Sequence, residues 1–237
     1  RKHMKKLSKK QRQNQQTSAV SLITLADKAS PVAEQYRTIR TNIQFASANR
    51  KMQTIVVTSA GAGEGKSTTI ANLAIVLADA GQRVLLVDAD MRKATVHKTF
   101  GLSNEAGLSL YLSSNQQIEG LAQHTSVANL SVLTAGPKPP NPSELLGSKR
   151  MDQFIEEACR LYDVILFDMP PIVVVTDAQI MASKVDGTLM VVREEVTRKD
   201  ALMNAKKMLD MVHAHILGVV YNGVEKGHAQ DYYYYGH

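Results

Sequence analysis

The sequence predicts an α/β domain with a mostly parallel β-sheet and helices on both faces. Short runs rich in β-branched residues alternate with helical segments, and they cover residues 54–58, 83–88, 130–134, 164–168, 187–193 and 216–222. Several runs (VLLVD, VILFD, TLMVV) are apolar almost throughout, which is typical of strands buried on both faces. The chain of 237 residues, 44% hydrophobic and 21% charged, is long enough to bury such a sheet.

Three segments are expected along the chain. Residues 1–30 form a basic, polar leader, residues 31–230 form the α/β domain, and residues 231–237 form a flexible tail. The first twelve residues carry seven Lys or Arg and no acid, whereas the rest carries 21 basic and 22 acidic residues. A solvated leader is the preferred interpretation, and docking on anionic lipid, nucleic acid or an acidic partner stays open.

Two absences bear on the compartment. No apolar run of about 18 residues occurs, so no membrane-spanning helix is expected, and no signal peptide is recognised. Cys159 is the only cysteine, which excludes an intramolecular disulfide and fits a reducing compartment. A cytoplasmic protein is expected.

The strongest motif is AGAGEGKS, residues 60–67, which lies between the run TIVVT and a helical segment. It matches the phosphate-binding P-loop, or Walker A motif, with Ala60 in place of the first glycine. Small residues let backbone N–H groups close around phosphates, and the helix N-terminus adds a favourable dipole. We therefore predict ATP-binding residues Gly61, Ala62, Gly63, Glu64, Gly65, Lys66, Ser67 and Thr68 in a P-loop NTPase. Lys66 neutralises the β- and γ-phosphates, and the Ser67 hydroxyl ligates Mg²⁺.

Acidic residues end two of the apolar runs. Asp88 ends VLLVD, and Asp90 follows it on the same side if the chain stays extended. Asp168 ends VILFD in a Walker B pattern. Ligands of α/β sheets bind at the carboxyl ends of strands, so the three carboxylates should face the phosphates. Carboxylates beside a polyanion repel it unless a divalent cation lies between them, which predicts Mg²⁺ as a cofactor.

Together these motifs resemble the bacterial tyrosine kinases (BY-kinases) that accompany capsule and exopolysaccharide synthesis. The resemblance rests on the altered P-loop, the sequence DADMR at residues 88–92, the sequence DMPP at residues 168–171 and the terminal tyrosines. EQYRTIR, residues 34–40, is similar to the family's ExxRxxR oligomerisation motif. PPNPSELLGS, residues 139–148, also looks like the family, although we assign it no chemistry.

The resemblance implies roles for individual residues. Asp88 is the expected base or orienter for the tyrosine hydroxyl, and Ser67, Asp90 and Asp168 serve Mg²⁺. Lys66, with Arg92 or Lys93, stabilises charge on the transferred phosphoryl group. Asn222 is similar to the position that reads adenine in related ATPases. The expected self-phosphorylation sites are Tyr232, Tyr233, Tyr234 and Tyr235.

The resemblance also implies partners. Glu34, Arg37 and Arg40 lie along one side of a helix running from Pro31 to about Ala48 and would join copies into a ring. A membrane-anchored activator would recruit the kinase to the inner face of the cell membrane. A cognate tyrosine phosphatase and protein substrates are implied, and no nucleic acid is expected.

Two alternatives remain from the sequence. A ParA/MinD-type ATPase shares the motifs, but such proteins carry a second lysine at the position of Gly61 and lack terminal tyrosines. A nucleotide-gated oligomeric scaffold would bind ATP without transferring phosphate to protein.

Overall fold

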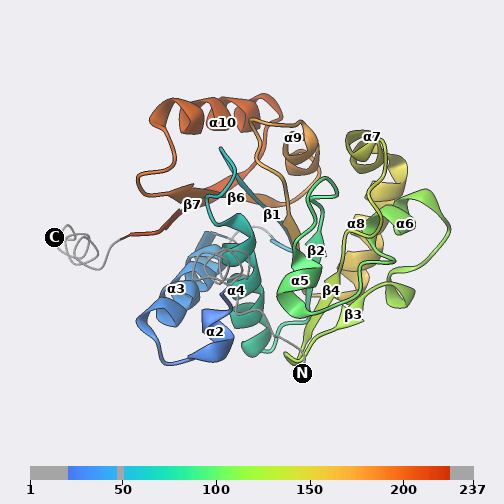
Figure 1. Ribbon diagram of the computed structural model, residues 1–237, viewed down its shortest axis with the longest axis horizontal. Coiled ribbons are helices and arrows are strands. Elements are labelled where there is room, and N and C mark those ends of the chain that lie inside the picture. The colour runs from blue at the N-terminus through green and yellow to red at the C-terminus, as the bar shows by residue number, and fades with distance from the viewer. Residues whose placement is uncertain (1–20, 47–50, 225–237) are drawn as a thin grey trace, which may run out of the picture.

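The computed structural model describes residues 21–46 and 51–224, which contain a sheet of seven strands with helices on both faces (Figure 1). The strand order is β3-β4-β2-β5-β1-β6-β7, and only β3 runs antiparallel to its neighbour. The strands are β1 (Thr54–Ser59), β2 (Val84–Asp88), β3 (Gln123–His124), β4 (Leu130–Leu133), β5 (Val164–Asp168), β6 (Gly187–Arg193) and β7 (Ile216–Asn222). The predicted α/β fold is confirmed, and only the two-residue β3, too short to show a pattern, was missed.

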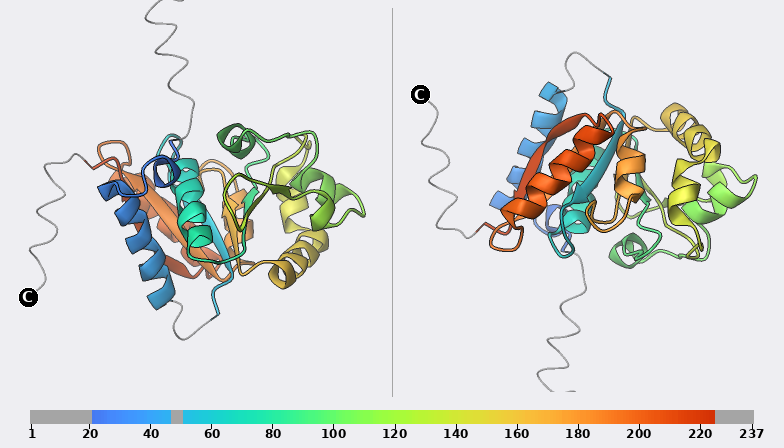
Figure 2. Two further views of the ribbon diagram at one scale, coloured as in Figure 1. Left: turned by 90° about the horizontal axis from the view of Figure 1, so that it is seen from below. Right: turned by 90° about the horizontal axis from the view of Figure 1, so that it is seen from above.

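Each face of the sheet has its own apolar core, because successive side chains of a strand point to opposite faces. Ile55 and Val57 of β1 pack in one core, and Val56 packs in the other. The first core is covered by α2 (Ile23–Ala26), α3 (Pro31–Ala46), α4 (Lys66–Asp79) and α5 (Val96–Phe100). The second is covered by α6 (Leu108–Ser113), the 3₁₀ helix η1 (Ile118–Gly120), α7 (Pro142–Gly147), α8 (Lys149–Leu161), α9 (Asp177–Ala182) and α10 (Lys199–Met211). Figure 2 shows α3 and α4 in front of the sheet in one view and α10 in the other.

The folded part of the chain begins before the boundary predicted at residue 30. Thr24 of α2 is buried against α4, where its N–H and hydroxyl donate to Asn72 Oδ1 at 3.0 and 2.8 Å. Residues 21–30 therefore belong to the domain rather than to the leader. The remaining leader (1–20) and the tyrosine tail lie outside the described residues. Within the described ranges, no helix is long and apolar enough to cross a bilayer.

Candidate functional site

The P-loop joins β1 to α4 and depends on a glycine at the first turn of the helix. Gly65 occupies the N-cap position of α4 with a φ of 94°, in the left-handed region that glycine adopts without strain. A Cβ atom there would lie 2.0 Å from Asn222 Nδ2, so a larger residue would displace the side chain that donates to the Glu64 carbonyl. The backbone conformation therefore favours glycine at this position, and the contact with Asn222 adds to that preference.

Three side chains hold the backbone of the P-loop. Glu64 is buried and its Oε1 accepts from the Gly61 N–H at 3.0 Å. Arg193 Nη1 donates to the Gly63 carbonyl at 3.0 Å, and Asn222 Nδ2 donates to the Glu64 carbonyl at 3.2 Å. The Glu64 side chain therefore helps to fix the loop through Oε1, and its second oxygen, Oε2, is buried without a hydrogen-bond partner.

Asp88 and Asp168 lie side by side because β2 and β5 are parallel neighbours that pair Asp88 with Asp168. Asp88 Oδ2 accepts from the backbone N–H groups of Thr95 and Val96 at 3.0 and 2.9 Å, which fixes the start of α5. The Oδ1 atoms of both aspartates are buried without a hydrogen-bond partner. Buried acceptors are normally satisfied, so these two oxygens indicate a ligand site.

The electrostatics of this acid pair are unfavourable for two negative charges. Burial, together with the charge of Asp168, raises the pKa of Asp88 to about 8. Burial also raises the pKa of Asp168 to about 6, against the lowering effects of the Lys66 and Ser67 side chains. Burial raises the pKa of Asp90 as well, and Lys66 opposes this rise. A cation between these carboxylates would relieve the conflict.

The predicted P-loop side chains, Lys66 and Ser67, lie close to these acids. The Ser67 side chain is close enough to Asp168 to lower the pKa of that carboxyl, and Thr95 Oγ1 lies 3.4 Å from Ser67 Oγ. The Lys66 ammonium is close enough to act on both Asp168 and Asp90. The fold therefore gathers residues from four separate positions in the sequence at the carboxyl ends of β1, β2 and β5.

The residues present fit Mg²⁺ held jointly by protein and phosphate. The described part of the chain contains no group of three or more His, Cys, Asp or Glu side chains arranged to hold a metal alone. Mg²⁺ in phosphoryl-transfer sites takes one or two carboxylates, the P-loop hydroxyl, phosphate oxygens and water. Ser67 and the free Oδ1 of Asp168 supply such oxygens.

The structure places the Arg92 side chain differently from the expectation that it stabilises the phosphoryl group. Its Nε and Nη2 donate to the two carboxylate oxygens of Asp177 at 2.9 and 3.0 Å, and Nη2 also donates to Ser143 Oγ at 2.9 Å. Lys93 donates its backbone N–H to Asp90 Oδ1 at 2.9 Å. Arg92 is therefore engaged with α7 and α9 and not with the P-loop.

A groove of about 830 Å³ opens beside the P-loop helix, between α3 and the end of β7. Its lining includes Tyr36 of α3, Thr69 of α4 and the β7 end from Val219 to Asn222, continuing to Val224. Burial raises the pKa of the Tyr36 hydroxyl. Asn222 thus contributes to this groove and to the P-loop at the same time.

Sequence reasoning missed Arg193 and Thr95. Arg193 ends a run that the sequence identified as a strand, and β6 pairs directly with β1, so its position beside the P-loop follows from strand order. The P-loop motif does not predict which strand pairs with β1, so Arg193 could not be identified from the sequence. Thr95 follows Asp88 by seven residues, and only the turn that Asp88 caps brings it back to the site.

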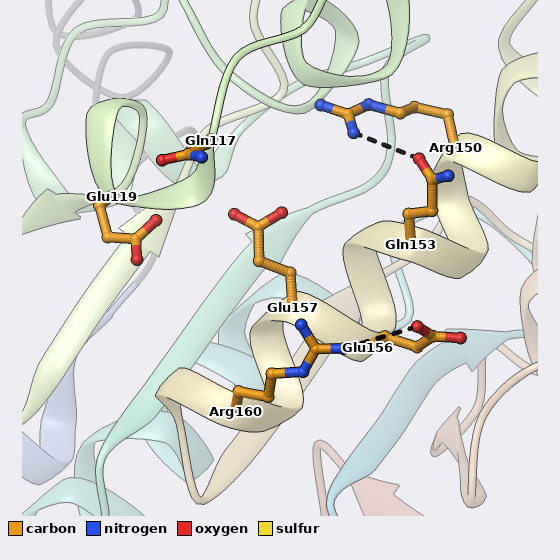
Figure 3. A pocket seen from close by; sticks show the side chains of 7 residues that line it. All are labelled: Gln117, Glu119, Arg150, Gln153, Glu156, Glu157 and Arg160. Atoms are coloured by element: carbon orange, nitrogen blue, oxygen red, sulfur yellow. Dashed lines mark hydrogen bonds and ion pairs between the residues drawn. The ribbon is translucent and has the colours of Figure 1, made fainter.

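A second hollow, of about 340 Å³, lies over α8 and η1, and no predicted site residue lines it (Figure 3). Arg150 stacks 4.1 Å over the Tyr111 ring and donates to Gln153, while Arg160 pairs with Glu156 at 3.8 Å. The side chains of Arg150 and Glu157 also bind backbone groups, so we assign the hollow a structural role.

The P-loop that follows β1 and the acids at the ends of β2 and β5 define a P-loop NTPase. Residues 52–216 match the family model described as an AAA domain. The chain is 46% identical over 216 residues to tyrosine-protein kinase YwqD of Bacillus subtilis, with 91% of each chain covered. Among solved structures, the chimerical protein CapA2B2 gives a TM-score of 0.84 at 40% identity, covering 86% of this chain and 90% of that one. The kinase domain of the Escherichia coli tyrosine kinase ETK also gives 0.84, at 33% identity, covering 88% and 82%.

The chain therefore belongs to the bacterial tyrosine kinase (BY-kinase) family and is a protein-tyrosine kinase. This assignment confirms the resemblance found in the motifs and favours the kinase over the ParA/MinD-type ATPase.

Proposed function

We propose that the P-loop and the acid pair form the ATP·Mg²⁺ site of this kinase. We also propose that the kinase phosphorylates the C-terminal tyrosines of another copy of the same chain. The observation that carries the proposal is the position of two orphaned oxygens, Asp88 Oδ1 and Asp168 Oδ1, beside Lys66 and Ser67. Mg²⁺, when bound, neutralises phosphate charge and aligns the phosphates.

The side chains divide the work of transfer. Lys66 stabilises negative charge on the transferred phosphoryl group, in a site where burial strengthens electrostatic effects. Asp88 orients the incoming tyrosine hydroxyl through Oδ1 and takes its proton late in the reaction, while Oδ2 stays fixed to α5. Ser67, Asp90 and Asp168 hold Mg²⁺. Asn222 and the groove at the end of β7 receive the nucleoside, because they adjoin the P-loop helix.

The activity is tested by incubating the purified protein with γ-labelled ATP and then hydrolysing it in acid. Phosphotyrosine supports the kinase, whereas labelled free phosphate without phosphotyrosine supports an ATPase. Bound nucleotide with neither product supports the nucleotide-gated scaffold. Omission of Mg²⁺ should abolish the phosphotyrosine and serves as the cofactor control.

We further propose that α3 joins copies of this chain into a ring. Arg37 pairs with Glu34 at 2.6 Å and also donates to the Lys28 carbonyl. Arg40 is partly buried, and its Nη1 donates to the Val76 carbonyl of α4 at 3.2 Å. Arg37 is therefore the better probe of an interface, since replacing Arg40 would also loosen α3 from α4.

We expect the Arg37→Ala variant to have a smaller mass than wild type by light scattering with Mg-ATP, because it loses a cation from the contact face. Arg160→Ala is the matched control, since Arg160 is an exposed helical arginine paired with Glu156 on α8. It should assemble as wild type does. Wild type that remains a monomer at high concentration would count against the ring.

We expect phosphorylation of Tyr232–Tyr235 to occur between chains. A Lys66→Met protein with an intact tail is mixed with an active chain ending at Gln230, so only transfer between copies can label the tail. Each phosphotyrosine adds roughly −1.5 to −2 charges at neutral pH, so the labelled tail should leave an acidic site and loosen the assembly. An unlabelled tail, at concentrations where wild type labels itself, would place the reaction within one chain. An unchanged mass after labelling would contradict the loosening alone.

The partners follow from the same proposal. A membrane-anchored activator recruits the kinase to the inner face of the cell membrane, a cognate tyrosine phosphatase reverses the modification, and the substrates are proteins rather than nucleic acids. The process served is capsule or exopolysaccharide synthesis.

A further inference from the structure

Three side chains from separate elements form a closed hydrogen-bonded cluster beside the proposed metal site. Asp177 of α9 is wholly buried, and Arg92 binds both of its carboxylate oxygens. Ser143 of α7 donates to Asp177 Oδ1 at 2.6 Å and accepts from Arg92 Nη2 at 2.9 Å. We call these residues the Arg92–Asp177–Ser143 cluster. The two charge-assisted hydrogen bonds between Arg92 and the Asp177 carboxylate are of a type that is both strong and specific in geometry.

The cluster joins two loops that carry acids of the site. The loop after β2, residues 89–95, contains Asp90 and Arg92. The loop after β5, residues 169–176, begins next to Asp168 and ends at Asp177. The start of the second loop is already tied to β1, because Thr58 Oγ1 donates to the Pro170 carbonyl at 2.9 Å. The cluster ties its far end to the first loop.

Ser143 also gives a role to the PPNPSELLGS stretch, to which the sequence suggested no chemistry. Pro142 opens α7, and Ser143 in its first turn is the residue that reaches Asp177 and Arg92. The hydroxyl donates once and accepts once within the cluster, so both of its roles are used there. The short helix therefore braces the site from outside.

We propose that Arg92, Asp177 and Ser143 are positioning residues that set the spacing of Asp90 and Asp168 and thereby the affinity for the divalent cation. The proposal rests on the proposed function, because it assumes that these acids serve Mg²⁺. Partners that orient metal-binding side chains commonly control affinity by about 10- to 100-fold. Arg92 thus acts through the acids and not on the phosphoryl group.

Arg92→Lys tests this proposal, because lysine keeps the charge beside Asp177 but cannot bind both oxygens and Ser143 in one plane. The readout is Mn²⁺ binding measured by electron paramagnetic resonance, with a non-hydrolysable ATP analogue present. We expect about tenfold weaker Mn²⁺ binding for Arg92→Lys, and a smaller weakening for Ser143→Ala. Ser143→Ala leaves no buried charge unpaired, so it keeps the test valid if Arg92→Lys does not fold.

The matched control is Arg83→Lys. Arg83 binds Asp163 through Nε and Nη2 at 3.2 and 2.7 Å, and this pair links the same two strands, β2 and β5, at their amino ends. Its Mn²⁺ affinity should equal that of wild type. Mn²⁺ affinity equal to that of wild type in both Arg92→Lys and Ser143→Ala, with slower transfer in Arg92→Lys alone, would overturn the proposal. It would instead support a role for Arg92 in stabilising charge on the phosphoryl group. Wild type that binds no Mn²⁺ with the analogue would instead overturn the proposed site itself.

Discussion

Replacing Lys66 with Met is expected to lower phosphotyrosine formation by about 10²- to 10³-fold, the usual effect of removing one preorganised group that stabilises transition-state charge. Lys66 opens α4, and its ammonium acts on Asp168 and Asp90. The helix N-terminus remains in the variant, but its partial charge cannot replace a full cation beside the phosphates. Methionine keeps much of the side-chain length, so the loop should retain its shape.

The measurement is incorporation of label into tyrosine at saturating Mg-ATP, with thermal unfolding as the check on folding. Lys98→Met is the control, because Lys98 is an exposed lysine of α5, the helix that Asp88 caps. It should transfer phosphate at close to the wild-type rate. Near-normal phosphotyrosine formation by folded Lys66→Met protein would refute the assignment of the P-loop lysine.

Asp88→Asn is expected to lower transfer by about 10²- to 10⁴-fold, the range of general acid–base catalysis, while Mg-ATP still binds. An asparagine oxygen can still accept from the N–H groups of Thr95 and Val96, so the start of α5 keeps its anchor. What the amide loses is an oxygen that takes a proton. The variant should therefore fold, bind nucleotide and fail at the chemical step.

Asp168→Asn is the contrasting variant, because it should raise the Mg²⁺ concentration needed for half-maximal nucleotide binding. Asp163→Asn is the control, since Asp163 precedes the same strand, β5, at the opposite end of the sheet. Nucleotide titrations at several Mg²⁺ concentrations, beside turnover at saturation, separate the two effects. If both Asp88→Asn and Asp168→Asn weakened only nucleotide binding, with turnover intact, the proposed division of roles would be wrong.

The sequence by itself determined the sheet and the residues at its carboxyl edge. Short, β-branched apolar runs such as VLLVD and VILFD are typical of strands buried on both faces of a parallel sheet, so the ends of β2 and β5 could be predicted. The P-loop was equally readable, because Gly65 supplies a backbone conformation that few other residues adopt. The grouping of Lys66, Ser67 and the acids then follows from a general property of α/β sheets.

Only the tertiary structure decided the partners of individual side chains. Strand order places β6 beside β1, which brings Arg193 to the P-loop, and no local pattern encodes that neighbour. Arg92 was expected at the phosphates because of its place in the DADMR motif, yet its guanidinium lies against Asp177, 85 residues further along the chain. Local sequence determines the hydrophobic periodicity and the backbone preference. The partner of a long charged side chain, in contrast, depends on which opposite charge the packing places within its reach, and such contacts join residues far apart in the sequence.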